Sequence, residues 1–226
     1  MKYYTAQEKQ SLFHLAEADE VLFGGAVGGG KSYAILWDAV SFCLRNKGVV
    51  ASIFRRTYPE LEKSIILVGL DCIPKKFYHY NKKEHRMYFT NGSILEFNYC
   101  LFDSDVYNYQ SAQYDRLYFD ELTHFTKSIY LYLLSRCRTT KPGIFPQIKS
   151  ASNPGNIGHE WVKQRFIVKA RSNEIVLRED PETGATYTTQ FIPAKLTDNY
   201  YLMKYDPQYI KRLEKLDKED RRALLE

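Results

Sequence analysis

The chain has 226 residues and a formal net charge of +5, with 44% hydrophobic and 26% charged residues. These values are typical of a globular protein with one sizeable α/β domain. We expect no secretion signal or membrane span, because no run approaches the roughly eighteen apolar residues that a span requires. The four cysteines lie far apart without zinc-ligand spacing, so we expect buried, reduced thiols.

The first half of the chain alternates strand-like and helix-like segments. Glu20 to Phe23 and Val49 to Phe54 are short apolar runs, and Ser32 to Leu44 between them carries apolar residues at helical spacing. Tyr58 to Leu61 is expected to open another helix, with Pro59 in its first turn. This strand–helix–strand order predicts a parallel sheet with a right-handed crossover.

An Asn91-Gly92 pair separates two further strand-like runs, Met87 to Thr90 and Ser93 to Phe97. We expect a β-hairpin here with a type I′ turn, since Asn-Gly supplies the positive φ angles that such a turn requires. This hairpin would be an antiparallel addition to an otherwise parallel sheet.

Strands and helices alternate again in the second half. The pattern predicts strands at Leu117 to Phe119, around Ile148 to Ala151 and at Thr186 to Ile192. It predicts helices from about Lys127 to Cys137, from His159 to about Lys169 and from Asp206 to the C-terminus, the last with Tyr209, Leu213 and Leu216 on one face. The fold class is therefore α/β, with a mostly parallel central sheet flanked by helices.

Residues Gly25 to Ser32 fit the pattern GxxxxGK[ST] between a predicted strand and a predicted helix. Glycines allow the backbone N–H groups to wrap phosphates, the Lys31 ammonium reaches the terminal phosphates, and the Ser32 hydroxyl ligates magnesium. A flexible glycine turn with a surface lysine is the alternative, and the flanking strand and helix argue against it. The loop therefore predicts a site for a nucleoside triphosphate and Mg²⁺.

Two polar segments follow later strands. Asp120 is expected to hold magnesium, and the adjacent Glu121 to activate water, which favours hydrolysis over phosphate transfer. Such an acidic pair is in other proteins often a helix cap. Asn153 follows Ser152 at the end of the next strand, where its side chain could contact the γ-phosphate or the attacking water. A simple turn at Asn153-Pro154 would explain the same residues.

The segments FGGAVGGGKS, FRRTYPEL, YFDEL, SASNPGN and TDNYYLMKYDPQYIKRLEKLDKEDRRALLE together resemble the N-terminal ATPase domain of the large terminase subunit of tailed bacteriophages. The resemblance covers nearly the whole chain. It implies a P-loop NTPase fold of the ASCE type over residues 1–226, with a core at about 1–195 and a C-terminal helical lid or linker at about 196–226. The implied function is an ATP-hydrolysing motor that packages double-stranded viral DNA into a procapsid.

The same resemblance implies roles for individual residues. Lys31 and Glu121 would be catalytic, Ser32 and Asp120 would hold Mg²⁺, and Ser152 and Asn153 would form the coupling motif. The residues expected to bind ATP are Gln7, Gly25, Gly28, Gly29, Gly30, Lys31, Ser32 and Tyr33. Gln7 resembles a glutamine that reads adenine, but an exposed residue of an N-terminal helix would look the same.

The implied partners are double-stranded DNA, further copies in a ring, usually of five, on the portal protein, the small terminase subunit, and a nuclease domain or subunit. The implied location is the cytoplasm of the infected bacterium, without membrane attachment. The chain stops where a linker to a nuclease domain should begin, so we expect no DNA cleavage by it. Lys75-Lys76 and Lys82-Lys83 are candidate DNA contacts, with a solvated surface as the simpler explanation.

Two departures from the family pattern leave the arginine finger unassigned. Val27 stands where some terminases have an arginine in the glycine loop, and Gln110-Ser111 stands where some have Arg-Gly. The candidates, which flank predicted strand ends or the helix that follows, are Arg55, Arg56, Arg116, Arg136 and Arg138. Arg138 and Arg56 come first among them, and ordinary surface pairing is the alternative. Two other functions remain open: a P-loop kinase for a small molecule, and a nucleotide-regulated assembly protein without essential turnover.

Overall fold

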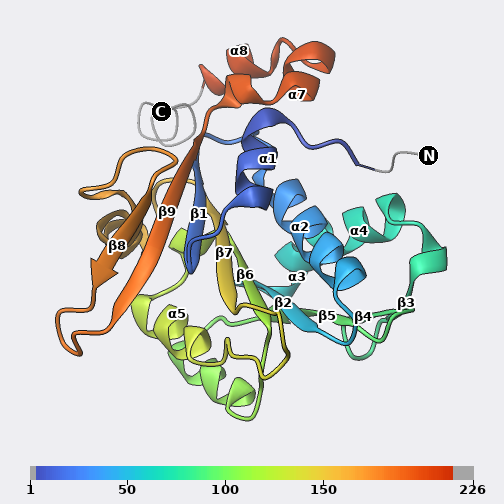
Figure 1. Ribbon diagram of the computed structural model, residues 1–226. Coiled ribbons are helices and arrows are strands. Elements are labelled where there is room, and N and C mark those ends of the chain that lie inside the picture. Colours follow the sequence, from blue (N-terminus) through green and yellow to red (C-terminus); the bar gives the residue numbers. More distant parts are fainter. Residues whose placement is uncertain (1–3, 216–226) are drawn as a thin grey trace.

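A nine-stranded mixed sheet runs through the computed structural model, which describes residues 4–215 (Figure 1). The strand order is β3-β4-β5-β2-β6-β7-β1-β9-β8, and the six strands from β5 to β9 in this order are parallel to one another. Antiparallel strands complete both edges. The strands are β1 (Glu20–Gly25), β2 (Val50–Arg55), β3 (Tyr78–Asn81), β4 (Arg86–Phe89), β5 (Ile94–Tyr99), β6 (Arg116–Asp120), β7 (Gln147–Ser152), β8 (Ile175–Glu179) and β9 (Thr186–Ala194).

Helices cover both faces of the sheet, and two short ones lie above its edge. They are α1 (Glu8–Leu15), α2 (Lys31–Arg45), α3 (Tyr58–Leu61), α4 (Leu67–Cys72), α5 (Lys127–Leu134), α6 (His159–Val162), α7 (Tyr200–Tyr205) and α8 (Tyr209–Leu213). Two π-helical segments, Glu62–Ile66 and Lys163–Ile167, continue α3 and α6. Figure 1 shows α7 and α8 above the sheet, next to the start of α1.

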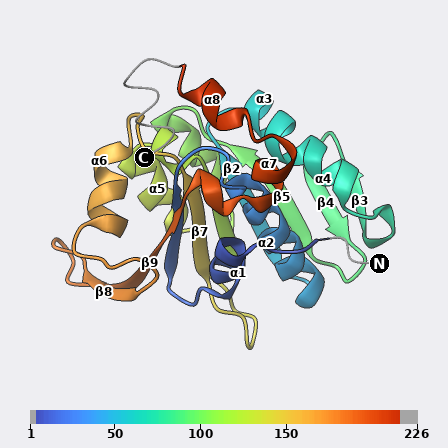
Figure 2. The same ribbon diagram turned by 90° about the horizontal axis from the view of Figure 1, so that it is seen from above.

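The core consists of two layers because side chains of a buried strand alternate between the two faces. In β1, Val21 and Phe23 pack into the layer with α1, α2 and α4, whereas Leu22 packs into the layer with α5 and α6. Figure 2 shows the sheet in section, with α2 on one side and α5 and α6 on the other. Both faces are buried, which explains the apolar runs in β1, β2 and β6. Strand β7 is the exception, because it buries the polar residues Gln147, Lys149 and Ser150.

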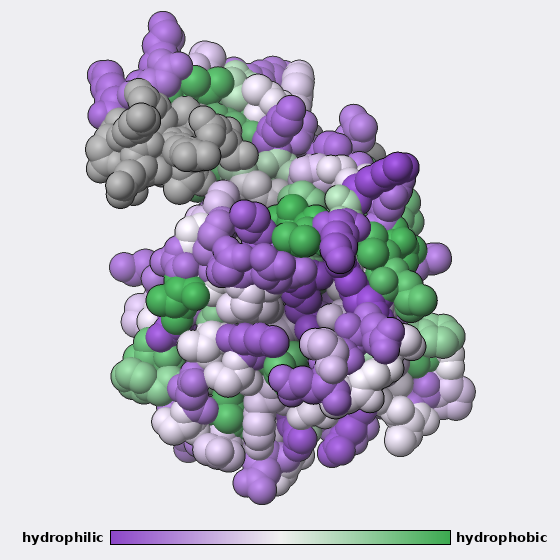
Figure 3. Space-filling view, turned by 90° about the vertical axis from the view of Figure 1, so that its left-hand side faces the viewer, coloured by the Kyte–Doolittle hydropathy of each residue, from purple (hydrophilic) through white to green (hydrophobic). Residues whose placement is uncertain are grey.

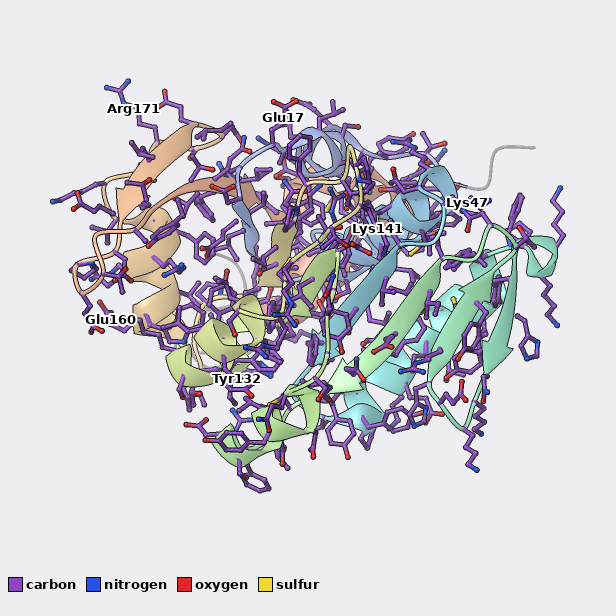
Figure 4. All side chains as sticks on the ribbon, turned by 60° about the horizontal axis from the view of Figure 1, so that its bottom comes forward. Glu17, Lys47, Tyr132, Lys141, Glu160 and Arg171 are labelled. Carbon is purple, nitrogen blue, oxygen red and sulfur yellow. The ribbon has the colours of Figure 1, made fainter. Side chains whose placement is uncertain are left out.

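The parallel strands place the functional residues together at one edge of the sheet. The strands β2, β6, β7 and β1 all end at this edge, with β7 between β1 and β6. The opposite edge appears in Figure 4, where Glu17, Lys47 and Lys141, which precede β1, β2 and β7, lie along the amino ends of the strands. Motifs far apart in the sequence therefore meet at the carboxyl edge.

The predicted α/β class, parallel sheet and antiparallel hairpin are confirmed. The prediction of a type I′ turn in the hairpin was wrong. Only Gly92 has a positive φ, of 84°, whereas a type I′ turn needs two such residues. Asn91 donates instead to the carbonyl oxygen of Cys43 at the end of α2 and accepts from the Ser93 N–H. This contact between elements fixes the backbone of Asn91.

Several boundaries differ from those that the sequence predicts. The helix at Lys127 ends at Leu134 and not at Cys137, because Cys137 forms a β-bridge with Tyr114. The helix at His159 ends at Ile167 and has a π-helical second half. The sequence pattern did not predict α1, β3 or β8, and Leu216 lies outside the described residues. None of the helices among residues 4–215 is long and apolar enough to span a bilayer.

Candidate nucleotide site

The glycine loop leaves β1 and enters α2 at Lys31. Gly25, Gly28 and Gly30 have φ angles of 128°, 80° and 70°, which side chains disfavour, and a Cβ at Gly25 would overlap the carbonyl oxygen of Ala194. Lys31 is 7% exposed and donates to the carbonyl oxygens of Gly25 at 3.2 Å and Ala26 at 2.5 Å. Burial lowers the pKa of Lys31 to about 8, although the nearby carboxylates Glu121 and Asp120 oppose this shift.

Ser32 and Asp120 meet across the sheet edge, where the Ser32 hydroxyl donates to Asp120 Oδ1 at 2.9 Å. Asp120 is 1% exposed, and its other oxygen accepts from Arg55 Nη1 at 2.6 Å. Burial raises the pKa of Asp120, Arg55 opposes this shift, and Glu121 adds to it. One hydroxyl and one carboxylate are the protein ligands that magnesium uses beside phosphate oxygens and water, so these residues fit the ion.

Glu121 follows Asp120 in the left-handed conformation, with a φ of 56°. The Asn153 amide donates to both of its carboxylate oxygens, at 3.1 and 3.2 Å. Ser152 contacts the same turn, since it accepts from the Thr123 N–H at 3.0 Å and donates to Thr123 Oγ1 at 2.9 Å. The structure thus brings both predicted coupling residues to the segment that carries the predicted catalytic glutamate.

A cleft of about 480 Å³ opens beside Gly30 on the α1 side of the loop. Gln7 and Tyr33, both predicted to bind nucleotide, line it. Gln10 is buried there and donates to the carbonyl oxygen of Gly30 at 3.0 Å. The further lining residues, none of which was predicted to bind nucleotide, are Tyr4, Thr5, Gln10, Asn199 and Tyr201. The combination of aromatic rings and amides suits a purine base.

The segment after β9 folds over the glycine loop. Asn199 Nδ2 donates to the carbonyl oxygen of Gly28 at 2.5 Å, and Asn199 Oδ1 accepts from Gln7 Nε2 at 3.1 Å. Gln7 Oε1 accepts from the Tyr200 N–H at 2.6 Å. The segment packs closely on the loop, because a Cβ at Gly28 would lie 2.7 Å from a Leu196 methyl group. Asn199 lies within the terminase-like ending, which was the one signal for it in the sequence.

The two arginine-finger candidates lie in different places. Arg56 donates to the carbonyl oxygen of His124, just beyond the predicted catalytic pair. The Arg138 N–H donates to the carbonyl oxygen of Tyr114, which precedes β6 and therefore lies at the amino edge of the sheet, opposite Asp120. Of these two candidates, Arg56 is the one close to the nucleotide edge of its own chain.

The two lysine pairs that were candidate DNA contacts lie near β3, at one edge of the sheet. All four side chains are exposed: Lys75, Lys76, Lys82 and Lys83. All four cysteines are free, but Cys72 and Cys137 are only partly buried. Within residues 4–215, no group of three His, Cys, Asp or Glu side chains is arranged to hold a metal. Figure 3, which faces the left side of Figure 1, shows scattered hydrophobic groups among hydrophilic residues.

Known structures share this fold. The large terminase of a thermophilic bacteriophage in complex with ADP matches with a TM-score of 0.74 and 14% identity, over 97% of this chain and 52% of that chain. The large terminase ATPase domain of Thermus phage P74-26 matches with a TM-score of 0.64 and 17% identity, over 98% and 93%. The N-terminal domain of the DNA packaging ATPase of bacteriophage phi29 matches with a TM-score of 0.52 and 16% identity, over 84% and 95%.

The chain spans about half the length of the thermophilic phage terminase. Among curated proteins, no sequence matches it. The family model described as "Terminase large subunit, T4likevirus-type, N-terminal" matches residues 22–226, which include the glycine loop, the Asp120–Glu121 pair and the Asn153 turn. The chain therefore belongs to the family of N-terminal domains of T4-like terminase large subunits.

Proposed function

We propose that this chain is an ATP-hydrolysing motor domain that drives the packaging of double-stranded viral DNA into a procapsid. The observation that carries this proposal is the arrangement at the sheet edge, where Ser32 meets Asp120 and Asn153 meets Glu121. Complexes of the thermophilic phage terminase, with which the chain shares its fold, contain ADP or ATP-γ-S and support ATP as the nucleotide.

In this proposal Lys31 exchanges its two carbonyl partners for terminal phosphate oxygens, which carry more negative charge. Glu121 accepts a proton from the attacking water, and Asn153 holds the carboxylate in the required orientation. Ser32 and Asp120 would hold Mg²⁺, which offsets the phosphate charge when bound.

The remaining predicted residues surround the nucleotide in the same proposal. Gln7 contacts the base, with Tyr33 beside it, because both line the cleft next to Gly30. The glycines of the loop let the backbone turn its N–H groups towards the phosphates, because glycine tolerates the positive φ angles of Gly25, Gly28 and Gly30. Gly29 lies between the last two.

The assembly around the domain is proposed from the family. A ring, usually of five copies, would sit on the portal protein in the host cytoplasm and act with the small subunit and a nuclease domain or subunit. DNA cleavage would not be an activity of this chain. Arg138 could act on a phosphate only from a neighbouring copy, because it lies at the opposite edge from its own Asp120. Arg56 could act within its chain or between copies.

Phosphate release with and without duplex DNA and procapsids tests this function. Lys31→Ala should weaken ATP binding, whereas Glu121→Gln should keep binding and lose turnover, since only the proton acceptor is removed. Equal loss of binding in both variants would contradict these roles. A phosphorylated small molecule in place of free phosphate would indicate a kinase, and packaging by Glu121→Gln would indicate an assembly protein.

A further inference from the structure

Arg55 ends β2 beside Asp120, because β2 and β6 are neighbouring parallel strands. Its Nη1 lies 2.6 Å from Asp120 Oδ2, while Asp120 Oδ1 accepts from the Ser32 hydroxyl at 2.9 Å. The two oxygens of the carboxylate therefore have different partners: one faces the glycine loop and the other faces an arginine of the same chain.

Resting on the proposed function, we propose that Arg55 is the positioning residue of the magnesium site. A carboxylate turns easily about its last side-chain bond, since this torsion has only broad minima. The charge-assisted bond from Arg55 fixes Oδ2 and so keeps Oδ1 directed at Ser32. Arg55 thereby sets which carboxylate oxygen is presented to the ion.

Arg55 is itself held in place from the other side. Its Nη1 also donates to Ser64 Oγ at 2.6 Å, and Ser64 donates to the carbonyl oxygen of Glu60 at 2.8 Å. The Arg55 side chain is only 14% exposed. A guanidinium can bind a carboxylate and a hydroxyl at once in a fixed plane, which a lysine ammonium cannot reproduce with the same geometry. The metal site is thus tethered to the π-helical segment that follows α3.

A purely structural ion pair is a weaker explanation for this contact. Buried pairs lose much of their Coulombic gain to desolvation, and well-packed apolar residues often replace them without loss of stability. Here one partner is a predicted metal ligand. The adjacent Arg56 faces the His124 carbonyl, so the two arginines have separate partners.

The test compares Arg55→Gln, Arg55→Lys and Ser64→Ala with the wild type by the Mg²⁺ concentration that half-saturates binding of a fluorescent ATP analogue. Loss of an outer partner of a metal ligand typically costs about 10–100-fold in metal affinity. We expect a rise of about tenfold for Arg55→Gln, a smaller rise for Arg55→Lys and the smallest for Ser64→Ala. Binding of the analogue in EDTA should stay unchanged in all three. Mn²⁺ binding to the ADP complex, followed by electron paramagnetic resonance, should weaken in the same order.

Arg86→Gln is the matched control, because Arg86 pairs with Glu96 away from the site. Wild-type Mg²⁺ dependence in Arg55→Gln would overturn the proposal, and if that variant does not fold, wild-type dependence in both Arg55→Lys and Ser64→Ala would do so. A wild-type protein that binds no nucleotide with or without Mg²⁺ would instead overturn the proposed function.

Discussion

Asn153 bonds both carboxylate oxygens of Glu121 through a single amide nitrogen. Among the described residues, the side-chain oxygen Oδ1 of Asn153 is buried without a partner. Glu121 also has a left-handed backbone, a conformation that costs about 1–3 kcal/mol in a residue other than glycine. The candidate catalytic carboxylate is therefore held in one orientation by the residue that follows strand β7.

Asn153→Ala should lower kcat about tenfold, because misorientation of a catalytic group costs factors of this order or more. ATP binding should be unchanged, since within residues 4–215 no hydrogen bond joins Asn153 to the glycine loop. Steady-state phosphate release and equilibrium binding measure the two effects. Gln164→Ala is the control, because the Gln164 amide donates to the exposed Glu160 and not to Glu121. An unchanged kcat in Asn153→Ala would show that Glu121 needs no such support.

Asn199→Ala should loosen the segment that covers the glycine loop. The substitution removes the Asn199 cap from the Leu202 N–H and leaves the Gly28 carbonyl oxygen and the Gln7 amide without this partner. Loss of a helix cap costs about 1 kcal/mol. Amide hydrogen exchange should therefore become several-fold faster in α7 and remain unchanged in α5.

The control for this prediction is Asn81→Ala, at the end of β3, where the Asn81 side chain accepts from the Lys83 and Glu84 N–H groups of the following turn. It removes a side-chain acceptor of the same kind, but far from the glycine loop, and should leave exchange in α7 as it is. Equal exchange in α7 for both variants would refute the role of Asn199.

Asp38→Asn tests a cluster of buried charged side chains around Asp38 in α2. Asp38 accepts from Lys149 at 2.9 Å and from Tyr118 at 2.7 Å, and it pairs with His14 at 2.8 Å. Burial raises the pKa of Asp38, but Lys149, His14 and Arg116 outweigh this effect and hold it at about 2. The substitution should lower the free energy of unfolding at pH 7 by about 3–5 kcal/mol, because the buried Lys149 ammonium loses its counter-charge.

The same cluster predicts a pH dependence. Since the pKa of Asp38 is lower in the folded protein than its ordinary value of 3.8, its stabilisation is complete above about pH 4 and is lost as the pH falls towards 2. Urea unfolding should therefore show the gap between wild type and Asp38→Asn narrowing below about pH 4. Asp71→Asn, at an exposed position, should show no gap at any pH. A constant gap for Asp38→Asn would mean that its carboxylate is not the stabilising form.

Gly25→Ala and Gly48→Ala separate backbone strain from steric overlap. Both glycines have positive φ, of 128° and 70°, but an added Cβ at Gly48 meets nothing within 4 Å. Gly48→Ala should cost about 1–2 kcal/mol, the usual penalty for a left-handed residue. Gly25→Ala should cost clearly more, because its Cβ would overlap the Ala194 carbonyl oxygen. Thermal or urea unfolding measures the loss of stability in each variant. An equal loss in both would mean that β9 moves away from the new Cβ at position 25 without cost.

The sequence predicted those parts of the site that are local. The glycine loop, the Asp120–Glu121 pair and Asn153 each follow a strand, and strands of a parallel sheet end at one edge, so their meeting could be expected. The contacts that support this centre could not be predicted. Arg55 reaches Asp120 through strand register, and Gln7 meets Asn199 through the path of the chain after β9. Neither relation leaves a periodic pattern in the sequence.

Some details of the fold could not be predicted from the sequence either. The hairpin at Asn91 was predictable, but its turn depends on a contact with Cys43 in α2. Strand β8 was missed because its partner β9 gives it structure, and Ile175 and Leu177 remain exposed in it. Contacts between segments far apart in the sequence therefore determine the turn at Asn91 and the position of β8, which the local secondary-structure propensities do not specify.

The strand that leads into the glycine loop has consequences for how the domain folds. Both neighbours of β1 come late in the chain, since Glu20 pairs with Ile148 in β7 and with Thr189 in β9. Such non-local pairs form slowly, because a long loop must close first. During synthesis β1 has no strand partner until β7 has left the ribosome, and the Gly28 carbonyl has no Asn199 until later still. The candidate nucleotide site therefore comes together only after β7 and β9 have been synthesised.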